Sequence, residues 1–290
     1  MTAVNFYEYI KSDPVKFKQL ACKDMLFAFY SCPQVDLKQE FFSQHNFITY
    51  TFNGEKRIHK GDKSWHLESE LAIFGRKGAY LFEKFENVEH CVMNFFIPDS
   101  YIKTVVSENR AQLPATRQTS SQVDAIVPLD LPPSTRAFFQ SMIAYFQDPP
   151  SESILELKFR ELLLNVMSNP RNQDVLSMAI NIQSHERPSI QHVMEDNFLY
   201  NLTMEDFAKI ALRSLPTFKR EFKTIYNTTP GKWLLQKRLE NATMLLNSTS
   251  KSVNEVAFES GFENNTHFSR VFKEKYGKSP VHFRKEMLSE

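Results

Sequence analysis

Cysteine is scarce in this sequence, and its few copies form no recognisable pattern. Cys22, Cys32 and Cys91 are an odd number, and their spacing matches neither a zinc site nor a disulfide framework. This suits a reducing compartment, in which we expect all three to be inert thiols. Glycine is also rare, with 7 copies against 26 of phenylalanine. That ratio indicates well-filled cores and argues against flexible linkers.

A long apolar run is likewise missing from the start of the chain. The first 17 residues mix charged and aromatic side chains, whereas a signal peptide or a membrane span requires a continuous apolar stretch. We therefore expect a cytoplasmic protein with no membrane partner. At 290 residues the chain is long enough for two domains of ordinary size.

Charge is unevenly distributed along the chain. The net charge is +1, yet residues 199–290 hold 15 Lys and Arg against 10 Asp and Glu, while the remainder holds 20 against 24. A basic C-terminal part fits a protein that meets a polyanion such as nucleic acid. Solvated lysine-rich faces are common, however, so this asymmetry alone does not establish such a partner.

The N-terminal part, residues 1–185, is predicted to be rich in strands over about 41–105. Short runs of β-branched and aromatic residues, such as FITYTF and CVMNFFI, are separated by turn segments such as NGEK and GRKG. Several short strands at close spacing predict an all-β sandwich or barrel. Before them we expect only a short helix over 12–21, with Pro14 in its first turn.

Helices are predicted over 134–183, and the first two form a hairpin over 134–167. Ser153 and Glu156 fit a capping box at the start of the second helix. That helix carries a long apolar face at helical spacing, made up of Leu155, Phe159, Leu162 and Val166. The face is either a homodimerisation surface or packs on the protein's own β-domain, and the sequence favours neither.

Residues 189–290 are predicted to be helical throughout and contain an internal duplication. FAKIALRSLPTFKREFKTIYNTTPGKW and, later, VAFESGFENNTHFSRVFKEKYGKSPVHF share an order of small, basic, aromatic and proline residues. Each copy supplies a small residue where two helices cross, a short turn, and a second helix with one apolar face, as a helix-turn-helix requires. We expect these units over about 204–226 and 252–276, joined by one helix over 230–246.

Single residues fit this interpretation. Ala208 and Ala257 are small enough for the helix crossings, and Gly261 permits the second turn. Ser214 is expected to cap the second helix of the first unit. Arg238, in the joining helix, either holds the two halves together or touches phosphate, and the sequence leaves both open.

The stretch VNEVAFESGFENNTHFSRVFKEKYGKSPVHFR is similar over its whole length to the signature of the tandem helix-turn-helix domain of the AraC/XylS family. The resemblance covers residues 189–287 and implies that one recognition helix of each unit enters a major groove of DNA. It implies base readout by Pro216, Lys219 and Arg220 in the first unit and by Asn265, Thr266 and Arg270 in the second. Phosphate or flanking contacts are expected from Ser214, Thr217, Lys223, His267, Ser269, Lys273 and Lys275.

The two units are not expected to contribute equally. In the second, arginine can contact guanine through two hydrogen bonds and asparagine can do the same with adenine. In the first, Leu212 stands where the family has the turn glycine, and Pro216 offers a base edge little beyond van der Waals contact. We therefore expect the second unit to carry more of the sequence specificity.

The segment GDKSWHLESELAIFGRKGAYLFEKF, followed by FFIPDSYI, resembles the cupin-like regulatory domains of the ExsA-like members of this family. A metal-dependent cupin would need a His-x-His pair with a nearby Glu and a later His. Tyr80 follows the turn where a ligand histidine would stand, and the histidines here are scattered, namely His45, His59, His66 and His90. We expect no metal, no cofactor and no enzyme activity. The alternative is a cupin-type metal-dependent enzyme fused to a DNA-binding tail.

The sequence thus predicts an α+β protein with an N-terminal cupin-like β-sandwich or barrel, a helical hairpin, and a C-terminal all-α tandem helix-turn-helix domain. The resemblance implies a sequence-specific transcription regulator, expected to be an activator, that is cytoplasmic and associated with the nucleoid. Its partners would be double-stranded DNA, RNA polymerase, and a small-molecule or protein effector that acts on the N-terminal domain.

Overall fold

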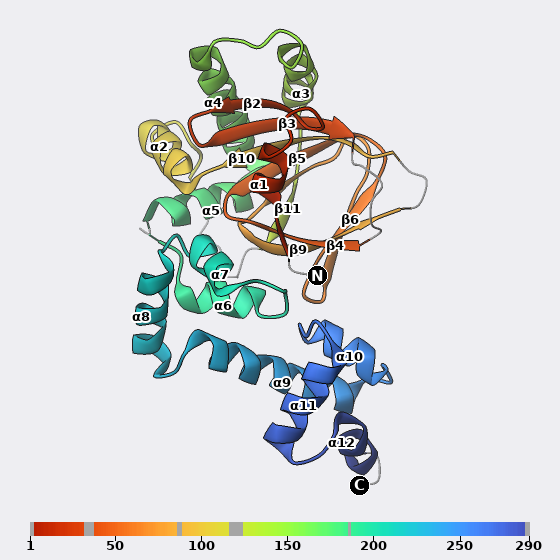
Figure 1. Ribbon diagram of the computed structural model, residues 1–290. Helices are drawn as coiled ribbons and strands as arrows, with labels where there is room; N and C mark the ends of the chain where they lie inside the picture. Colours follow the sequence, from red (N-terminus) through yellow and green to blue (C-terminus); the bar gives the residue numbers. More distant parts are fainter. Residues whose placement is uncertain (1–2, 32–37, 86–88, 116–123, 185–186, 288–290) are drawn as a thin grey trace. The chain divides into compact units, whose positions relative to one another are not determined.

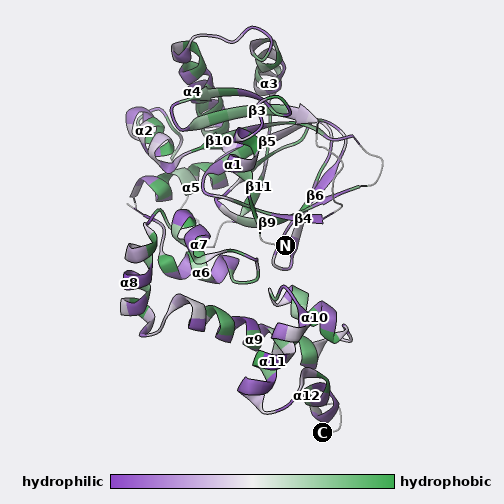
Figure 2. Cartoon of the chain, viewed as in Figure 1, coloured by the Kyte–Doolittle hydropathy of each residue, from purple (hydrophilic) through white to green (hydrophobic). Residues whose placement is uncertain are grey.

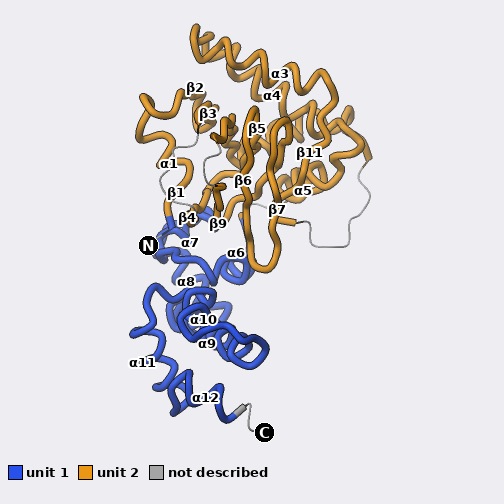
Figure 3. Tube along the Cα trace, turned by 90° about the vertical axis from the view of Figure 1, so that its right-hand side faces the viewer, with its two compact units in different colours: residues 1–3, 188–290 blue, residues 4–187 orange. Residues whose placement is uncertain are grey.

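The computed structural model of this chain consists of two structural domains (Figure 3). Residues 4–187 form the β-rich domain, and residues 188–290 with residues 1–3 form the helical domain. The structure describes residues 3–31, 38–85, 89–115, 124–184 and 187–287. Cys32 lies outside these residues, whereas Cys22 is buried and Cys91 is half-buried.

The β-rich domain is a sandwich of two sheets (Figure 1). The five-stranded sheet has the order β1 (Val4–Asn5), β4 (Lys38–Ser43), β9 (Gly78–Lys84), β6 (Lys56–Lys60), β7 (Lys63–Leu67). The six-stranded sheet has the order β11 (Ile126–Leu129), β8 (Ala72–Gly75), β5 (Asn46–Asn53), β10 (Cys91–Ile97), β3 (Met25–Ser31), β2 (Lys18–Cys22). All of these strand pairs are antiparallel except β1 with β4. This arrangement confirms the predicted β-sandwich.

Both faces of the six-stranded sheet are buried. In β5, Phe47 belongs to a core shared with the five-stranded sheet, whereas its neighbour Ile48 belongs to a core shared with the helices. Successive side chains of a strand point to opposite faces, so such a strand needs apolar residues on both. Figure 2 accordingly shows β3 and β10 coloured mostly as hydrophobic.

Helices cover the second face of this sheet (Figure 1). The helices of the β-rich domain are α1 (Phe6–Lys11), α2 (Asp99–Asn109), α3 (Pro133–Tyr145), α4 (Glu152–Ser168) and α5 (Gln173–Ser184), with a short 3-10 turn at Pro170–Asn172. The apolar face of α4 packs here, because Leu155, Phe159, Leu162 and Val166 are all buried in the core that α4 shares with the sheet. These four side chains therefore pack on the protein's own domain and do not form a dimer surface.

Two local predictions for the β-rich domain are wrong. The predicted helix over 12–21 is absent: α1 lies earlier, at Phe6–Lys11, and β2 begins at Lys18. The Asn5 side chain accepts a hydrogen bond from the backbone N–H of Glu8 and so starts α1 there. Helix α4 is capped by Ser151, which accepts from the Ile154 backbone N–H, and not by the predicted Ser153.

The helical domain contains the predicted helical repeat (Figure 1). Its helices are α6 (Ile190–Asn197), α7 (Met204–Ile210), α8 (Leu215–Tyr226), α9 (Pro230–Ser248), α10 (Val253–Glu259), α11 (Asn265–Tyr276) and α12 (Pro280–Met287). Helices α7 and α8 make the first helix-turn-helix unit, α10 and α11 make the second, and α9 joins them. Among the described helices, none combines the length and apolar character needed to cross a membrane.

Candidate nucleic-acid interface

The first helix of each unit begins at a capping box. In α7, Thr203 accepts from the Asp206 backbone N–H at 3.2 Å, and the Asp206 carboxylate accepts from the Thr203 backbone N–H at 3.0 Å. In α10, Ser252 and Glu255 make the same two bonds at 3.2 and 2.7 Å. The hydrogen bonds from Ser252 hold the pKa of Glu255 below its usual value. Reciprocal caps of this kind fix where a helix starts, so both units begin at a defined residue.

The turn of each unit is built on one residue with left-handed backbone. Leu212 has φ 54° and Gly261 has φ 82°. In both turns the next residue donates its backbone N–H five residues back, from Arg213 to Ala208 at 2.9 Å and from Phe262 to Ala257 at 3.0 Å. This bond and the left-handed residue are the marks of a Schellman helix end. The two turns therefore have the same backbone, although only the second has the glycine that adopts it without strain.

Each recognition helix buries one face and leaves the other exposed. In α8 the buried residues are Phe218 and Phe222, and in α11 they are Phe268, Val271 and Phe272. The predicted base-reading residues lie away from these faces: Pro216, Lys219, Arg220, Thr266 and Arg270 are exposed and Asn265 is half-buried. Of the predicted flanking residues, Ser214, Lys223, His267, Lys273 and Lys275 are exposed and Thr217 and Ser269 are half-buried. Most members of both sets are therefore open to solvent.

Two details in α11 concern the predicted readers directly. Asn264, and not Asn265, caps the helix, because its side chain accepts from the His267 backbone N–H at 2.8 Å. Arg270 donates to Glu274 at 3.0 Å, and both side chains are about 60% exposed, at 63% and 59%. An exposed ion pair of this type contributes little and opens at small cost. Arg270 can therefore leave Glu274 for a base.

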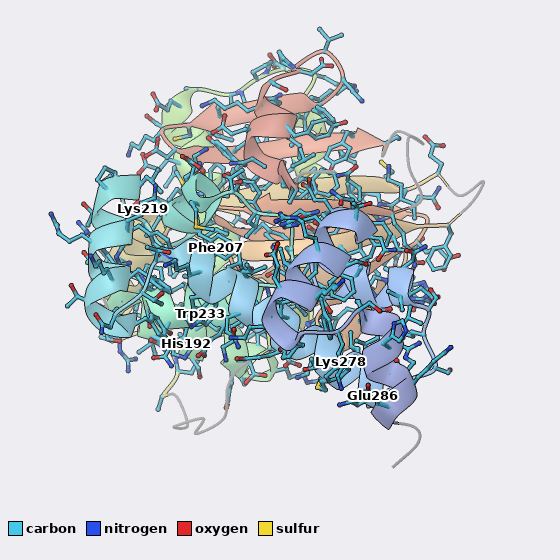
Figure 4. All side chains as sticks on the ribbon, turned by 60° about the horizontal axis from the view of Figure 1, so that its bottom comes forward. His192, Phe207, Lys219, Trp233, Lys278 and Glu286 are labelled. Carbon is cyan, nitrogen blue, oxygen red and sulfur yellow. The ribbon has the colours of Figure 1, made fainter. Side chains whose placement is uncertain are left out.

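Helix α9 is fixed at its start by aromatic packing. Trp233 lies 6.0 Å from Phe222 and 5.6 Å from Tyr226, measured between ring centroids. Figure 4 labels Trp233 on α9 and Lys219 on α8. Phe283 repeats this arrangement in the second unit, at 5.3 Å from Phe272 and 5.7 Å from Tyr276. The 19 residues of α9 make a spacer about 28 Å long, comparable to the roughly 34 Å between successive major-groove faces.

Arg238 holds the helical domain together. Its guanidinium donates to the carbonyl oxygens of Phe198 and Tyr200, each at 2.7 Å. Gly261 lies against the same group, since a Cβ at this position would come within 2.8 Å of the Arg238 Nε atom and of the Leu199 carbonyl oxygen. Of the two roles that the sequence left open, these contacts support the structural one.

Sequence reasoning missed Arg213, which supports the first recognition helix. It lies in the turn, pairs with Glu221 of α8 at 2.7 Å, and donates to the carbonyl oxygens of Pro188 and Ala211. These bonds connect the turn, the start of the domain and α8. The only signal in the sequence was the position of an arginine directly after Leu212, the residue that stands in the predicted turn.

The scattered histidines of the β-rich domain do not form a metal site within the described ranges, where no three His, Cys, Asp or Glu residues lie together. His59 pairs with Glu83 at 2.8 Å and His66 with Glu55 at 2.7 Å. Burial lowers the pKa of His45 to about 4 and that of His90 to about 3. Both imidazoles are therefore neutral near pH 7.

Comparison with known proteins connects both domains to transcription regulators. Residues 207–286 match the family model of a helix-turn-helix domain, and residues 46–178 match that of the ExsA N-terminal regulatory domain. These matches define a class, regulators that combine a DNA-binding domain with a regulatory domain. Within this class the chain is similar in both domains to AraC-family transcription regulators.

The similar proteins are distant in sequence. The virulence regulon transcriptional activator VirF of Yersinia enterocolitica is 24% identical over 233 residues, which cover 80% of this chain and 86% of VirF. The regulator ExsA of Pseudomonas aeruginosa is 22% identical over 233 residues, 80% and 83% of the two chains. Among solved structures, apo ToxT of Vibrio cholerae covers 90% of this chain and 96% of its own, with 12% identity and a TM-score of 0.43.

Proposed function

We propose that this chain activates transcription by reading a specific DNA sequence with α8 and α11, and that α11 is the principal reader. One observation carries the proposal: two units with the same turn backbone each expose polar residues opposite a fully buried apolar face. In α11 the exposed set includes Thr266 and Arg270 beside the half-buried Asn265, whose side chains match the hydrogen-bonding edges of bases. In α8, Pro216 lacks such groups, which leaves Lys219 and Arg220 to contribute.

The test is a gel-shift competition between a selected site and random DNA. A good bidentate base contact is worth about 1–3 kcal/mol, so R270A and N265A should each lower the preference for the selected site roughly 5- to 150-fold. K273A should weaken binding to both DNAs alike and reduce the salt slope by about one. A suitable control is R171A, because Arg171 is an exposed arginine paired with Asp130 in the β-rich domain. Unchanged preference in both R270A and N265A would remove the proposed readout.

The remaining contacts follow from the same placement. Ser214, Thr217 and Lys223 flank the readers of α8, and His267, Ser269 and Lys275 flank those of α11. We assign these residues to phosphate or to the edges of the site, where they position the protein without reading sequence.

Activation, in our proposal, proceeds through RNA polymerase under control of the β-rich domain. The similar protein VirF is a transcriptional activator, which supports this direction of regulation. The effector is a small molecule or a partner protein, and the chain acts in the cytoplasm on the nucleoid. In vitro transcription with purified RNA polymerase tests the activity: transcript should rise when the chain is added to its selected site. A fall would make the protein a repressor.

Self-association through the hairpin is a second proposal and uses different residues from those first expected. On α4, Ile154 is 42% exposed and Leu157 is 60% exposed. These side chains lie one helical turn apart and form an apolar strip on the outer face. Sedimentation of L157E should show weaker association than that of E161Q, a control on the same helix. A monomeric wild-type chain would rule out the dimer.

A further inference from the structure

The two helix-turn-helix units differ at one pair of positions between the turn and the recognition helix. Directly after the left-handed residue, the first turn has Arg213 where the second has Phe262. Seven residues after the helix cap, α8 has Glu221 where α11 has Val271. Phe262 and Val271 are 3% and 6% exposed and belong to one apolar core. In the first unit an ion pair of 2.7 Å therefore stands where the second unit has apolar side chains.

Arg213 also binds two backbone groups. Its Nη1 atom donates to the carbonyl oxygen of Pro188 at 2.7 Å and to that of Ala211, at the end of α7, at 2.6 Å. The Arg213 side chain is only 12% exposed. Pro188 is the residue at which the chain leaves the β-rich domain and enters the helical domain. One side chain therefore connects α8, through Glu221, to the entry point of its domain.

The second recognition helix is held in a different way. The side chain of Phe262 has no hydrogen-bonding group, and its ring packs on that of Phe268 in α11, with the centroids 5.0 Å apart. Apolar packing has little directional preference, whereas a hydrogen bond weakens steeply as its distance and angle change. The orientation of α8 thus depends on where the Pro188 carbonyl group lies, and that of α11 is set by packing inside its own unit.

Stability alone does not account for the ion pair. Two charges removed from water lose hydration, so replacing a buried pair by well-packed apolar residues often leaves stability unchanged or higher. The second unit has such apolar residues at the equivalent positions, Phe262 and Val271. What the charged pair adds is a bond of defined geometry to the backbone at Pro188. This bond concerns the orientation of α8.

We propose that Arg213 is a positioning residue that makes base reading by α8 depend on the segment entering the domain at Pro188, while reading by α11 does not. The inference rests on the proposed function, in which both helices read DNA and the β-rich domain exerts control, and it assigns that control to the first unit. Arg213 acts through Glu221 and does not itself touch DNA. Movement of the segment at Pro188 would break one charged hydrogen bond and let α8 shift, while α11 keeps its half of the site.

Gel-shift competition with single base-pair changes in the selected site tests this asymmetry. Loss of preference in R220A identifies the base pairs read by α8, and loss in R270A identifies those read by α11. R213M should lower the preference at the α8 base pairs roughly three- to tenfold and at the α11 base pairs less than about twofold. A smaller folded fraction weakens binding to all DNAs alike, so it cannot mimic this pattern. Equal losses at both sets, or none at the α8 set, would overturn the inference.

A transplant of the apolar pair provides the rescue. R213F/E221V gives the first unit the two side chains of the second and should restore the preference at the α8 base pairs to within about twofold of wild type. The matched control is K209M, which removes an exposed positive charge four residues before Arg213 and should leave both sets of preferences unchanged. A transplant that reads the α8 base pairs no better than R213M, or a K209M that loses as much as R213M, would overturn the role of Arg213.

Dependence on the entry segment is tested with P188G. Proline fixes its own φ angle, and glycine in its place frees the carbonyl group to which Arg213 donates. The preference at the α8 base pairs should fall roughly two- to fivefold in wild type and stay unchanged in R213F/E221V, which does not make this bond. P188G alters no helix, so it tests the inference even where R213M fails to fold. An equal effect in both backgrounds, or none in wild type, would overturn the inference.

The outcomes separate this inference from the proposed function. If neither R220A nor R270A changes any preference, the proposed readout fails and this inference fails with it. If each acts on its own base pairs, while R213M and P188G affect both sets alike, the readout stands and the inference alone is overturned.

Discussion

The turns of the two helix-turn-helix units can be tested by exchanging their left-handed residues. At Leu212, with φ 54°, a non-glycine residue costs about 1–2 kcal/mol, whereas glycine costs about 0.5–1 kcal/mol through its freedom in the unfolded chain. Leu212 is 39% exposed, so glycine gives up the burial of the rest of its surface, and this loss offsets the relief of strain. We therefore expect L212G to change the free energy of unfolding of the helical domain by no more than about 1 kcal/mol.

At Gly261 the reverse change should be costly. Alanine would adopt φ 82° at a cost of about 1–2 kcal/mol, and its Cβ would lie 2.8 Å from the Arg238 Nε atom and from the Leu199 carbonyl oxygen. The Leu199 carbonyl oxygen belongs to the backbone and cannot rotate away. The Arg238 side chain is the part that can shift, and a shift weakens its charged hydrogen bonds. We expect G261A to lower the free energy of unfolding by about 2–4 kcal/mol.

Urea unfolding followed by Trp233 fluorescence isolates the helical domain when Trp65, the other of 2 tryptophans, is replaced by phenylalanine. The control is G231A in α9, where a Cβ meets no atom within 4 Å and alanine should stabilise the helix by about 0.5–1 kcal/mol. If L212G cost as much as G261A, or if G261A cost no more than G231A, the strain assigned to these turns would be wrong.

Three further predictions follow from single contacts. E274Q should raise DNA affinity about two- to fivefold, because Arg270 loses a competing carboxylate; equal or weaker binding in a gel shift would contradict this. Stability should fall as the pH drops from about 6.5 to 4, since the pKa values of His45 and His90 are lowered to about 4 and 3 and the unfolded chain binds the extra protons. The free energy of unfolding, measured by urea titration at several pH values, should depend less steeply on pH in H90Q, by up to about 1.4 kcal/mol per pH unit. An unchanged slope would refute the assignment. R238M should cost about 2–4 kcal/mol, because two carbonyl oxygens lose charged donors; a near-neutral result by urea unfolding would show that these bonds contribute little.

The helical domain was predictable because its signals are local. Helix ends are marked by capping residues such as Thr203 and Ser252, and the turn of the second unit is marked by Gly261. The apolar spacing of Phe268 and Phe272 fixes the buried face of α11, and the exposed face follows from it. Arg238 and Arg213 required the structure. The partners of Arg238 lie 38 and 40 residues away, and Arg213 bonds to Pro188, 25 residues away.

The start of the chain was predicted poorly because its elements are short and depend on distant partners. β2 alternates, with Leu20 and Cys22 buried, but it is a strand because it pairs with β3. β11 contains Pro128, which lacks a backbone N–H and is tolerated because this strand lies at the edge of its sheet. Neither pairing can be inferred from the residues of the strand itself.

A different case is α2, which falls inside the segment predicted to be β-rich. Its buried residues Tyr101, Ile102, Val105 and Val106 follow a helical period, so the signal was present in the sequence. This helical signal was missed because the apolar run of β10 directly precedes α2 and has a similar composition. The spacing of the apolar residues distinguishes a helix from a strand more reliably than their composition does.

The buried Lys56 shows where sequence reasoning stops. Alternation along β6 and β9 predicts that Lys56 shares a face with Ile58, and Lys84 with Phe82. From alternation alone, a lysine on an inward face would be interpreted as a break in the pattern or as the end of a strand. Only the register, which sets Lys56 opposite Lys84, shows that these two exceptions are neighbours on one face of the sheet. Chemistry that depends on residues from several strands is therefore encoded in the pairing of the strands, and a single sequence does not specify that pairing.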